Sequence, residues 1–174
     1  MARAKNRSAA VRALDSARAL DAEVRHIGFG PFAVAESATD EESTFDAVDD
    51  DDSLIAVSRA LFLDGHYASA VFEAYKCLNN FVKVASGSID LDGAQLMNHV
   101  FSPKRPVLVL SDLNSASRRD EQLGYMQILA GVMTGVRNPR AHEHGFKDDP
   151  KSALELLGLA NHLMRVVRRV STSG

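Results

Sequence analysis

The chain has 174 residues, of which 45% are apolar, enough to bury the core of one domain with an extension. It has no run of about 18 or more apolar residues and only one cysteine, so the sequence excludes a transmembrane helix and an internal disulfide. Its net charge of −3 does not exclude a nucleic-acid partner, because local charge governs such binding.

The N-terminal part divides into a basic helix and an acidic segment. Residues 7–26 place apolar side chains at helical spacing and are followed by glycine and proline. We therefore predict an N-terminal amphipathic helix within residues 1–30. Residues 36–52 contain nine acidic residues and no basic residue, a composition typical of solvated chain. Residues 31–51 are therefore predicted to form a mobile acidic linker, with shielding of a basic cleft in cis as a second interpretation.

A helical hairpin opens the main domain, for which we predict the boundaries 52–172. Residues 52–64 are expected to form a short helix, and Gly65-His66 makes the turn after it. Residues 67–85 then carry apolar side chains three and four positions apart, which indicates an amphipathic helix. Because the turn is short, these two helices should pack antiparallel.

The second half of the domain reads as three further helices. Residues 91–102 form the first, and the stretch 103–116, with its prolines and apolar run, reads as a short strand or a packed loop. Residues 117–137 have a helical pattern, but Pro139 disfavours helix at the residue before it, so this helix should end or kink there. The last helix covers 149–170, beginning with an Asp-Pro pair suited to an N-cap and a first helical residue. Together the elements predict an all-α bundle.

The joint between the last two helices, GVRNPRAHEH at 135–144, concentrates polar chemistry. Arg137 is a permanent cation that suits phosphate. His142 can give or take a proton near neutral pH, and Asn138 can donate and accept hydrogen bonds. Phosphodiester cleavage needs such charge stabilisation and proton transfer, and RNA needs no metal because its own 2′-OH is the nucleophile. The alternative left open is that Arg137 caps helix carbonyls and His142 lies exposed in a loop.

Other polar residues give weaker signals. The histidines of HEH at 142–144 stand two apart and would not share a helix face, so we expect no metal and no other cofactor. The single Cys77 lies in an apolar stripe, which favours a buried thiol and a reducing cytoplasm. We interpret the remaining groups as structural or solvated: histidines His66, His99 and His162, core methionines Met126, Met133 and Met164, and the helix-end arginines Arg165, Arg168 and Arg169, which alternatively touch RNA.

These features resemble the HEPN domains (higher eukaryotes and prokaryotes nucleotide-binding). The run RNPRAH at 137–142 matches the R-x(4–6)-H motif of that family. The segment GHYASAVFEA at 65–74 looks like the family's G-x-Y-x-x-A-V-x-x-A opening. The longer stretch from GAQLM at 93–97 to the motif is similar to the bacterial Ymh-type subgroup of HEPN-like proteins. The resemblance covers residues 52–170, about two thirds of the chain.

The resemblance implies a HEPN-like bundle of four or five helices, here with an additional N-terminal helix. It also implies a metal-independent endoribonuclease that acts as a homodimer, with two motifs facing each other in one composite cleft. Arg137 would then hold the scissile phosphate, His142 would transfer protons and Asn138 would orient one of them, leaving 2′,3′-cyclic phosphate and 5′-OH ends. Further RNA contacts are expected from Lys76, Arg140 and His144.

Many relatives of this kind act as toxins or effectors in phage defence, through toxin–antitoxin or abortive-infection systems. The expected partners are therefore RNA and an antitoxin or sensor protein, and no membrane. Some members carry a tyrosine two residues after the motif histidine, where an antitoxin modifies them. This chain has His144 there, so that form of control is not expected. The alternative function is a non-catalytic helical module that dimerises or binds nucleotides.

Overall fold

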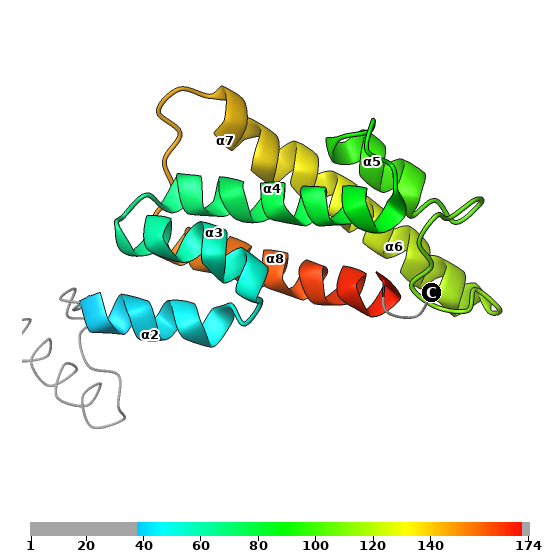
Figure 1. Cartoon of the computed structure of the whole chain (residues 1–174), viewed down its shortest axis with the longest axis horizontal. Coiled ribbons are helices and arrows are strands. Elements are labelled where there is room, and N and C mark those ends of the chain that lie inside the picture. Colours follow the sequence, from blue (N-terminus) through cyan, green and yellow to red (C-terminus); the bar gives the residue numbers. More distant parts are fainter. Residues whose placement is uncertain (1–37, 172–174) are drawn as a thin grey trace, which may run out of the picture. The chain divides into compact units, whose positions relative to one another are not determined.

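The computed structural model describes residues 38–171, so the predicted helix within residues 1–30 lies outside the described residues. All regular structure in the described part is helical, which confirms the predicted all-α bundle (Figure 1). No helix in this part is long and apolar enough to cross a membrane. The elements are α2 (Ala38–Val48), α3 (Asp52–Leu63), α4 (Tyr67–Ser86), α5 (Gly93–Val100), α6 (Ala116–Val132), the π-helical turn η1 (Met133–Arg137), α7 (Asn138–His142) and α8 (Pro150–Ser171).

Helix α4 lies at the centre of the described bundle and packs against α3, α5, α8 and the π turn (Figure 1). Helix α3 precedes it across the tight turn at Gly65-His66 and packs alongside it, as the predicted hairpin requires. The buried side chains of α4 recur every three or four residues, in agreement with the apolar pattern of the sequence. These residues are Ala70, Val71, Ala74, Tyr75, Leu78, Asn79 and Val82.

Capping residues fix where the long helices begin and end. Asp51 Oδ1 accepts hydrogen bonds from two backbone N–H groups of α3, at 3.0 and 3.3 Å. Asp149 Oδ1 accepts from the backbone N–H of Ser152 at 3.0 Å, and Pro150 is the first residue of α8, as predicted. Helix α4 ends at Gly87, whose φ of +67° is the left-handed conformation that glycine adopts without strain.

Helix α8 closes the core against α4. Tyr75 is fully buried, and its hydroxyl donates to the carbonyl of Leu156 at 2.9 Å, so the polar end of this large side chain is paired. The methionines predicted as core residues lie there: Met133 and Met164 are fully buried and Met126 packs at the edge. The fully buried side chains of α8 are Ala153, Leu157, Ala160, Leu163, Met164 and Val167.

The acidic segment is where the structure differs most from the sequence prediction. Residues 38–48 form helix α2 and not the predicted mobile linker, and Phe45 of this helix is fully buried. Its ring centroid lies 5.4 Å from that of Phe62 in α3, a contact that anchors α2 to the bundle. The acids of α2 stay on the surface and pair with a cation of α3: Arg59 donates to Asp46 at 2.9 Å and to Glu42, and both carboxylates are about half exposed. The many acidic residues of this segment underlie the prediction of a linker, whereas burial of Phe45 stabilises a helix there.

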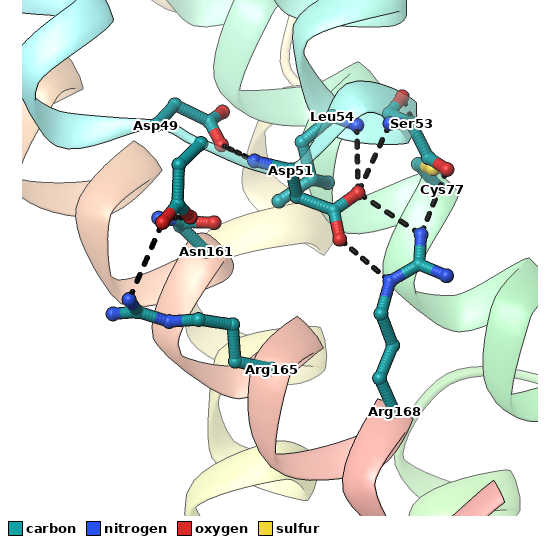
Figure 2. A network of polar contacts seen from close by, with 9 residues as sticks. Asp49, Asp51, Ser53, Leu54, Cys77, Asn161, Arg165 and Arg168 are labelled. Atoms are coloured by element: carbon teal, nitrogen blue, oxygen red, sulfur yellow. Dashed lines mark hydrogen bonds and ion pairs between the residues drawn. The ribbon is translucent and has the colours of Figure 1, made fainter. Parts of the chain in front are cut away.

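A polar network, shown in Figure 2, ties the start of α3 to α8. Arg168 donates to the two carboxylate oxygens of Asp51 at 2.6 and 3.1 Å and to Ser53 Oγ at 2.8 Å. Arg165 lies 3.6 Å from Asp50. Two of the three arginines interpreted as a solvated helix end are thus paired with acids of the acidic segment, and those acids stabilise the bundle itself.

Residues 103–115 form a packed loop without a strand, which decides between the two alternatives predicted for 103–116, and Ala116 already belongs to α6. The fully buried side chain of Gln122 replaces the hydrogen bonds that a neighbouring strand would supply. Its Oε1 accepts from the N–H of Leu110 at 2.9 Å, and its Nε2 donates to the carbonyls of Phe101 and Leu108, both at 3.0 Å.

Candidate functional site

The RNPRAH motif lies on a helix that continues through it. Helix α6 passes directly into the π turn and then into α7, whereas the sequence predicts a helix end or kink at Pro139. The N–H of Asn138 donates to the carbonyl of Met133, five residues earlier, as in a π turn. This extra residue shifts the register, so Pro139 stands in the first turn of α7, where its missing N–H and fixed φ are tolerated.

Helical geometry brings Asn138 and His142 to the same side of α7. They stand four positions apart, the spacing at which side chains on a helix are neighbours. His142 is exposed at the end of α7, and Asn138 is half-buried. An amide next to an exposed imidazole can orient the ring through a hydrogen bond, which is the role that the resemblance implies for Asn138.

Arg137 closes the π turn and is held by an acid that the sequence alone does not reveal. Its Nη1 lies 3.1 Å from Oδ2 of Asp92, at the start of α5. The Arg137 side chain is 18% exposed, so the guanidinium is sheltered but still reachable from solvent. Its Nε is buried and has no hydrogen-bond partner among the described residues. Arg137 therefore makes an ion pair and not the helix cap that stood as the alternative.

Asp92 is in turn held by two residues of α4. Its Oδ1 accepts from Asn79 Nδ2 at 2.6 Å and lies 3.1 Å from Lys83 Nζ. The fully buried Asn79 also accepts, through Oδ1, a hydrogen bond from the N–H of Gly93 at 2.9 Å. Partial burial acts to raise the pKa of Asp92, but the hydrogen bonds from Lys83, Asn79 and Arg137 outweigh it and lower the pKa. The carboxylate is therefore ionised at neutral pH.

The sequence contains partial signals for this network. Asn79 and Lys83 stand four positions apart on the helix predicted for residues 67–85, and an Asp-Gly pair lies at the start of α5. What brings them to Arg137 is the packing of α4 against α5 and the π turn, which no local pattern encodes. These residues are consequently absent from the predicted site.

Arg140, predicted to contact RNA, is buried in a structural ion pair. Its side chain is only 6% exposed, and its guanidinium donates to the Asp148 carboxylate at 2.7 and 2.6 Å. It also donates to the carbonyl of Val136 at 2.7 Å and lies 4.7 Å from the ring of Phe146. A guanidinium occupied in this way holds the loop after α7 against the helix. We therefore assign Arg140 a structural role and leave it out of the proposed site.

The other two predicted RNA contacts lie on the surface, and no contact within the described residues joins them to Arg137. His144 is exposed in the loop that follows α7. Lys76 of α4 lies 3.0 Å from Glu73, and its side chain is 45% exposed. Within residues 38–171, no three His, Cys, Asp or Glu side chains are grouped as metal ligands.

A comparison with known protein families gives a match to this chain. A family model described as "Protein of unknown function (Hypoth_ymh)" matches residues 50–167. Neither a curated protein nor a solved structure matches the chain. The matched residues run from the start of α3 into α8 and contain the whole RNPRAH motif. The chain therefore belongs to the Hypoth_Ymh family.

Proposed function

We propose that this protein is a metal-independent endoribonuclease of HEPN type. The observation that carries the proposal is the arrangement around the π turn: Arg137, sheltered and cationic, directly precedes a helical turn that presents Asn138 and the exposed His142 on one side. π turns inside helices are frequent at functional sites. A permanent cation beside a titratable imidazole is the pairing that phosphodiester cleavage requires.

The reaction uses only groups of the RNA and of the motif. An imidazole of His142 takes the proton of the ribose 2′-OH, and the freed oxygen attacks the neighbouring phosphorus. The bond from phosphorus to the 5′ oxygen breaks, and that oxygen takes a proton from an imidazolium. Arg137 offsets the charge that builds on the phosphoryl oxygens. The products are a 2′,3′-cyclic phosphate and a 5′-OH, and the proton count balances.

This chemistry favours a homodimer. The base that deprotonates the 2′-OH and the acid that protonates the leaving oxygen act on opposite sides of the phosphorus in an in-line displacement. One motif supplies one histidine, His142, in a position suited to either task. A second copy of the chain supplies the other, so we infer a composite site formed by two motifs.

Helix α6 offers a surface for that second copy. Leu123 and Ile128 are 38% and 45% exposed. Gly131 and Gly135 follow Ile128 at spacings of three and four, and a Cβ added at either glycine would meet no atom within 4 Å. Ile128, Gly131 and Gly135 thus form an open strip that leads through α6 and the π turn to the motif. Covering it with the same strip of another protomer would bury the apolar side chains and bring two motifs together.

A non-catalytic module is the second candidate, and one observation favours it. The Arg137 guanidinium is already paired with Asp92 and is mostly sheltered, as in an arginine that only stabilises a fold. Such a module would dimerise or bind nucleotides through the same surface without cutting RNA.

The two candidate functions differ in whether the protein cleaves a strand that carries a 2′-OH. Purified protein is incubated with EDTA and either an RNA or the DNA of the same sequence. The endoribonuclease cuts only the RNA and leaves 2′,3′-cyclic phosphate and 5′-OH ends. A binding module retains either strand intact. Cleavage of the DNA would contradict the proposed mechanism, because DNA lacks the nucleophile.

The proposed biological setting is growth arrest in phage defence, with an antitoxin or sensor protein as the controlling partner. On this proposal, expression of the full chain without that partner arrests growth, and His142→Ala relieves the arrest at equal protein levels. Arrest that persists in His142→Ala would assign the effect to something other than RNA cleavage.

A further inference from the structure

Asp92 occupies the N-cap position of α5, but its carboxylate makes no capping hydrogen bond. An N-cap aspartate ordinarily accepts hydrogen bonds from the first N–H groups of its own helix. Here Asn79 takes part of that task, through its bond from the N–H of Gly93. Both oxygens of Asp92 are left for side chains of other elements, with Asn79 and Lys83 on Oδ1 and Arg137 on Oδ2.

Contacts with α4 hold the Asp92 carboxylate independently of Arg137. Asn79 is fully buried in the centre of α4, so its amide cannot turn away, and its 2.6 Å bond fixes Oδ1 of Asp92. Lys83, one helical turn further along, lies 3.1 Å from the same oxygen. Oδ1 is thus held from two sides, and the other oxygen, Oδ2, lies 3.1 Å from Nη1 of Arg137.

The charges around Asp92 leave the site cationic. One carboxylate lies between Lys83 and Arg137, at 3.1 Å from each, so the three groups together carry one positive charge. The ion pair therefore orients the arginine without cancelling its attraction for a phosphate.

We propose that Asp92 is a positioning residue of the ribonuclease site: held by Asn79 and Lys83, it fixes the guanidinium of Arg137 at the place where the scissile phosphate binds. The inference rests on the proposed function, because the orientation of Arg137 matters to turnover only when a phosphate meets it.

A purely structural role for the pair predicts something different. The Asp92 side chain is 50% exposed, and ion pairs this open contribute little to stability. A structural pair would therefore change both stability and turnover only slightly when it is broken. A positioning residue changes turnover strongly while stability stays nearly the same.

The test uses Asp92→Asn, with Asp46→Asn as the matched control. Asp46 is also the partner of an arginine, accepting two hydrogen bonds from Arg59, but it lies on α2. We expect Asp92→Asn to lower kcat for RNA cleavage by about 10- to 100-fold, the usual range for residues that orient a catalytic group. KM should change by less than about threefold, because the interaction counts mainly in the transition state. Asp46→Asn should keep the wild-type kcat and KM.

A double variant shows whether Asp92 acts through Arg137. In an Arg137→Ala background, adding Asp92→Asn should cause no further loss of cleavage, since the group being positioned is already absent. Losses that multiply would mean that Asp92 acts independently of Arg137, and they would overturn the inference.

A third readout does not depend on activity. The buried Nε–H of Arg137 should exchange with water slowly in the wild type, as measured by NMR of the protein labelled at arginine, and at least about tenfold faster in Asp92→Asn. If the wild type cuts RNA and Asp92→Asn cuts it equally well, the positioning role is wrong and the proposed function stands. If the wild type cuts no RNA, the proposed function fails, and unchanged Nε–H exchange in Asp92→Asn would also remove the claim that Asp92 orders Arg137.

Discussion

At the scale of single residues, the two arginines of the motif have opposite environments. Arg140 is buried, paired with a buried carboxylate and covered by an aromatic ring. Arg137 is partly open, and its acid partner is half-exposed. A guanidinium that is buried and fully paired contributes to folding, whereas one that is partly exposed to solvent can still bind a ligand.

Arg140→Ala should therefore act on stability. Removing one member of a buried ion pair leaves the other charge uncompensated, and we expect a loss of about 3 kcal/mol or more in the free energy of unfolding. Urea unfolding measures it, with Arg118→Ala as the control, since Arg118 forms an exposed pair with Glu121 and should lose less than about 1 kcal/mol. Equal losses in both variants would contradict the structural assignment of Arg140.

Asp49, between α2 and α3, predicts a pH dependence of stability. It is 2% exposed, and one of its carboxylate oxygens, Oδ2, is buried without a hydrogen-bond partner. Burial, with smaller contributions from the neighbouring acids, raises its pKa from 3.8 to about 6. The folded protein thus holds this proton more tightly than the unfolded chain, so the contribution of Asp49 to stability falls as the pH rises from about 4 to 6.

Asp49→Asn removes the ionised form, so the variant should be more stable than the wild type at pH 7.5. The gain is at most about 3 kcal/mol, for a shift of about two pKa units, and it should vanish near pH 4. Urea unfolding at both pH values tests this, with the exposed Asp90→Asn as the control. A gain of the same size at both pH values would show that titration of Asp49 is not its cause.

At the scale of elements, the π turn explains how a proline stays within a helix. A regular α-helix would set the ring of Pro139 against the carbonyl four residues before it. One additional residue in the turn Met133–Arg137 avoids that contact, and α7 follows the turn without a break. The same turn ends at Arg137, so one feature both accommodates the proline and places the cation of the proposed site.

Removing one residue from this turn should restore the clash between the Pro139 ring and the carbonyl four residues before it. Thr134 is exposed, and its side chain donates to the carbonyl of Ala130. Deletion of this residue would force Pro139 into an α-helical interior. We expect a loss of about 3 kcal/mol in the free energy of unfolding. Adding Pro139→Ala to the deletion should restore most of that stability in the same urea assay. No rescue by alanine would show that the turn has another cause.

Elements with strong periodicity could be predicted from the sequence, and those decided by distant contacts could not. The hairpin of α3 and α4 and the helix beginning at Pro150 follow from apolar spacing and capping residues. Helix α2 depends on the burial of Phe45 against Phe62, which outweighs the surrounding charge. Within the proposed site, Arg137 and His142 could be predicted from their chemistry, whereas Asp92 could not, because the packing of α5 against the π turn brings it to Arg137.

At the scale of the described bundle, the acidic residues and the RNPRAH motif have different roles and lie on different elements. The acids at 46–51 pair with arginines of α3 and α8 and bind that end of the structure together. The motif lies beyond α6, whose exposed strip has no cover in the described chain. The proposed second protomer would cover this strip, which leads along α6 toward the motif.

Ile128→Asp should break the proposed dimer. A charge in the middle of a buried apolar strip is costly to desolvate, so the variant should elute as a monomer at concentrations where the wild type is a dimer. Light scattering coupled to size-exclusion chromatography measures the mass. Val84→Asp, at a 79% exposed position on α4, is the control and should leave the mass unchanged. A wild type that is already monomeric at high concentration would contradict the composite site.

The most direct test of the central claim is the single-turnover cleavage of one labelled RNA, with EDTA present, by the wild type, His142→Ala and His99→Ala. His99 is an exposed histidine on α5 and controls for loss of an imidazole as such. We predict cleavage at equal rates by the wild type and His99→Ala, and a rate at least about 100-fold lower for His142→Ala, the usual effect of removing a general acid or base. Equal cleavage by all three proteins, or by none of them, would contradict the assignment of this site as a ribonuclease centre.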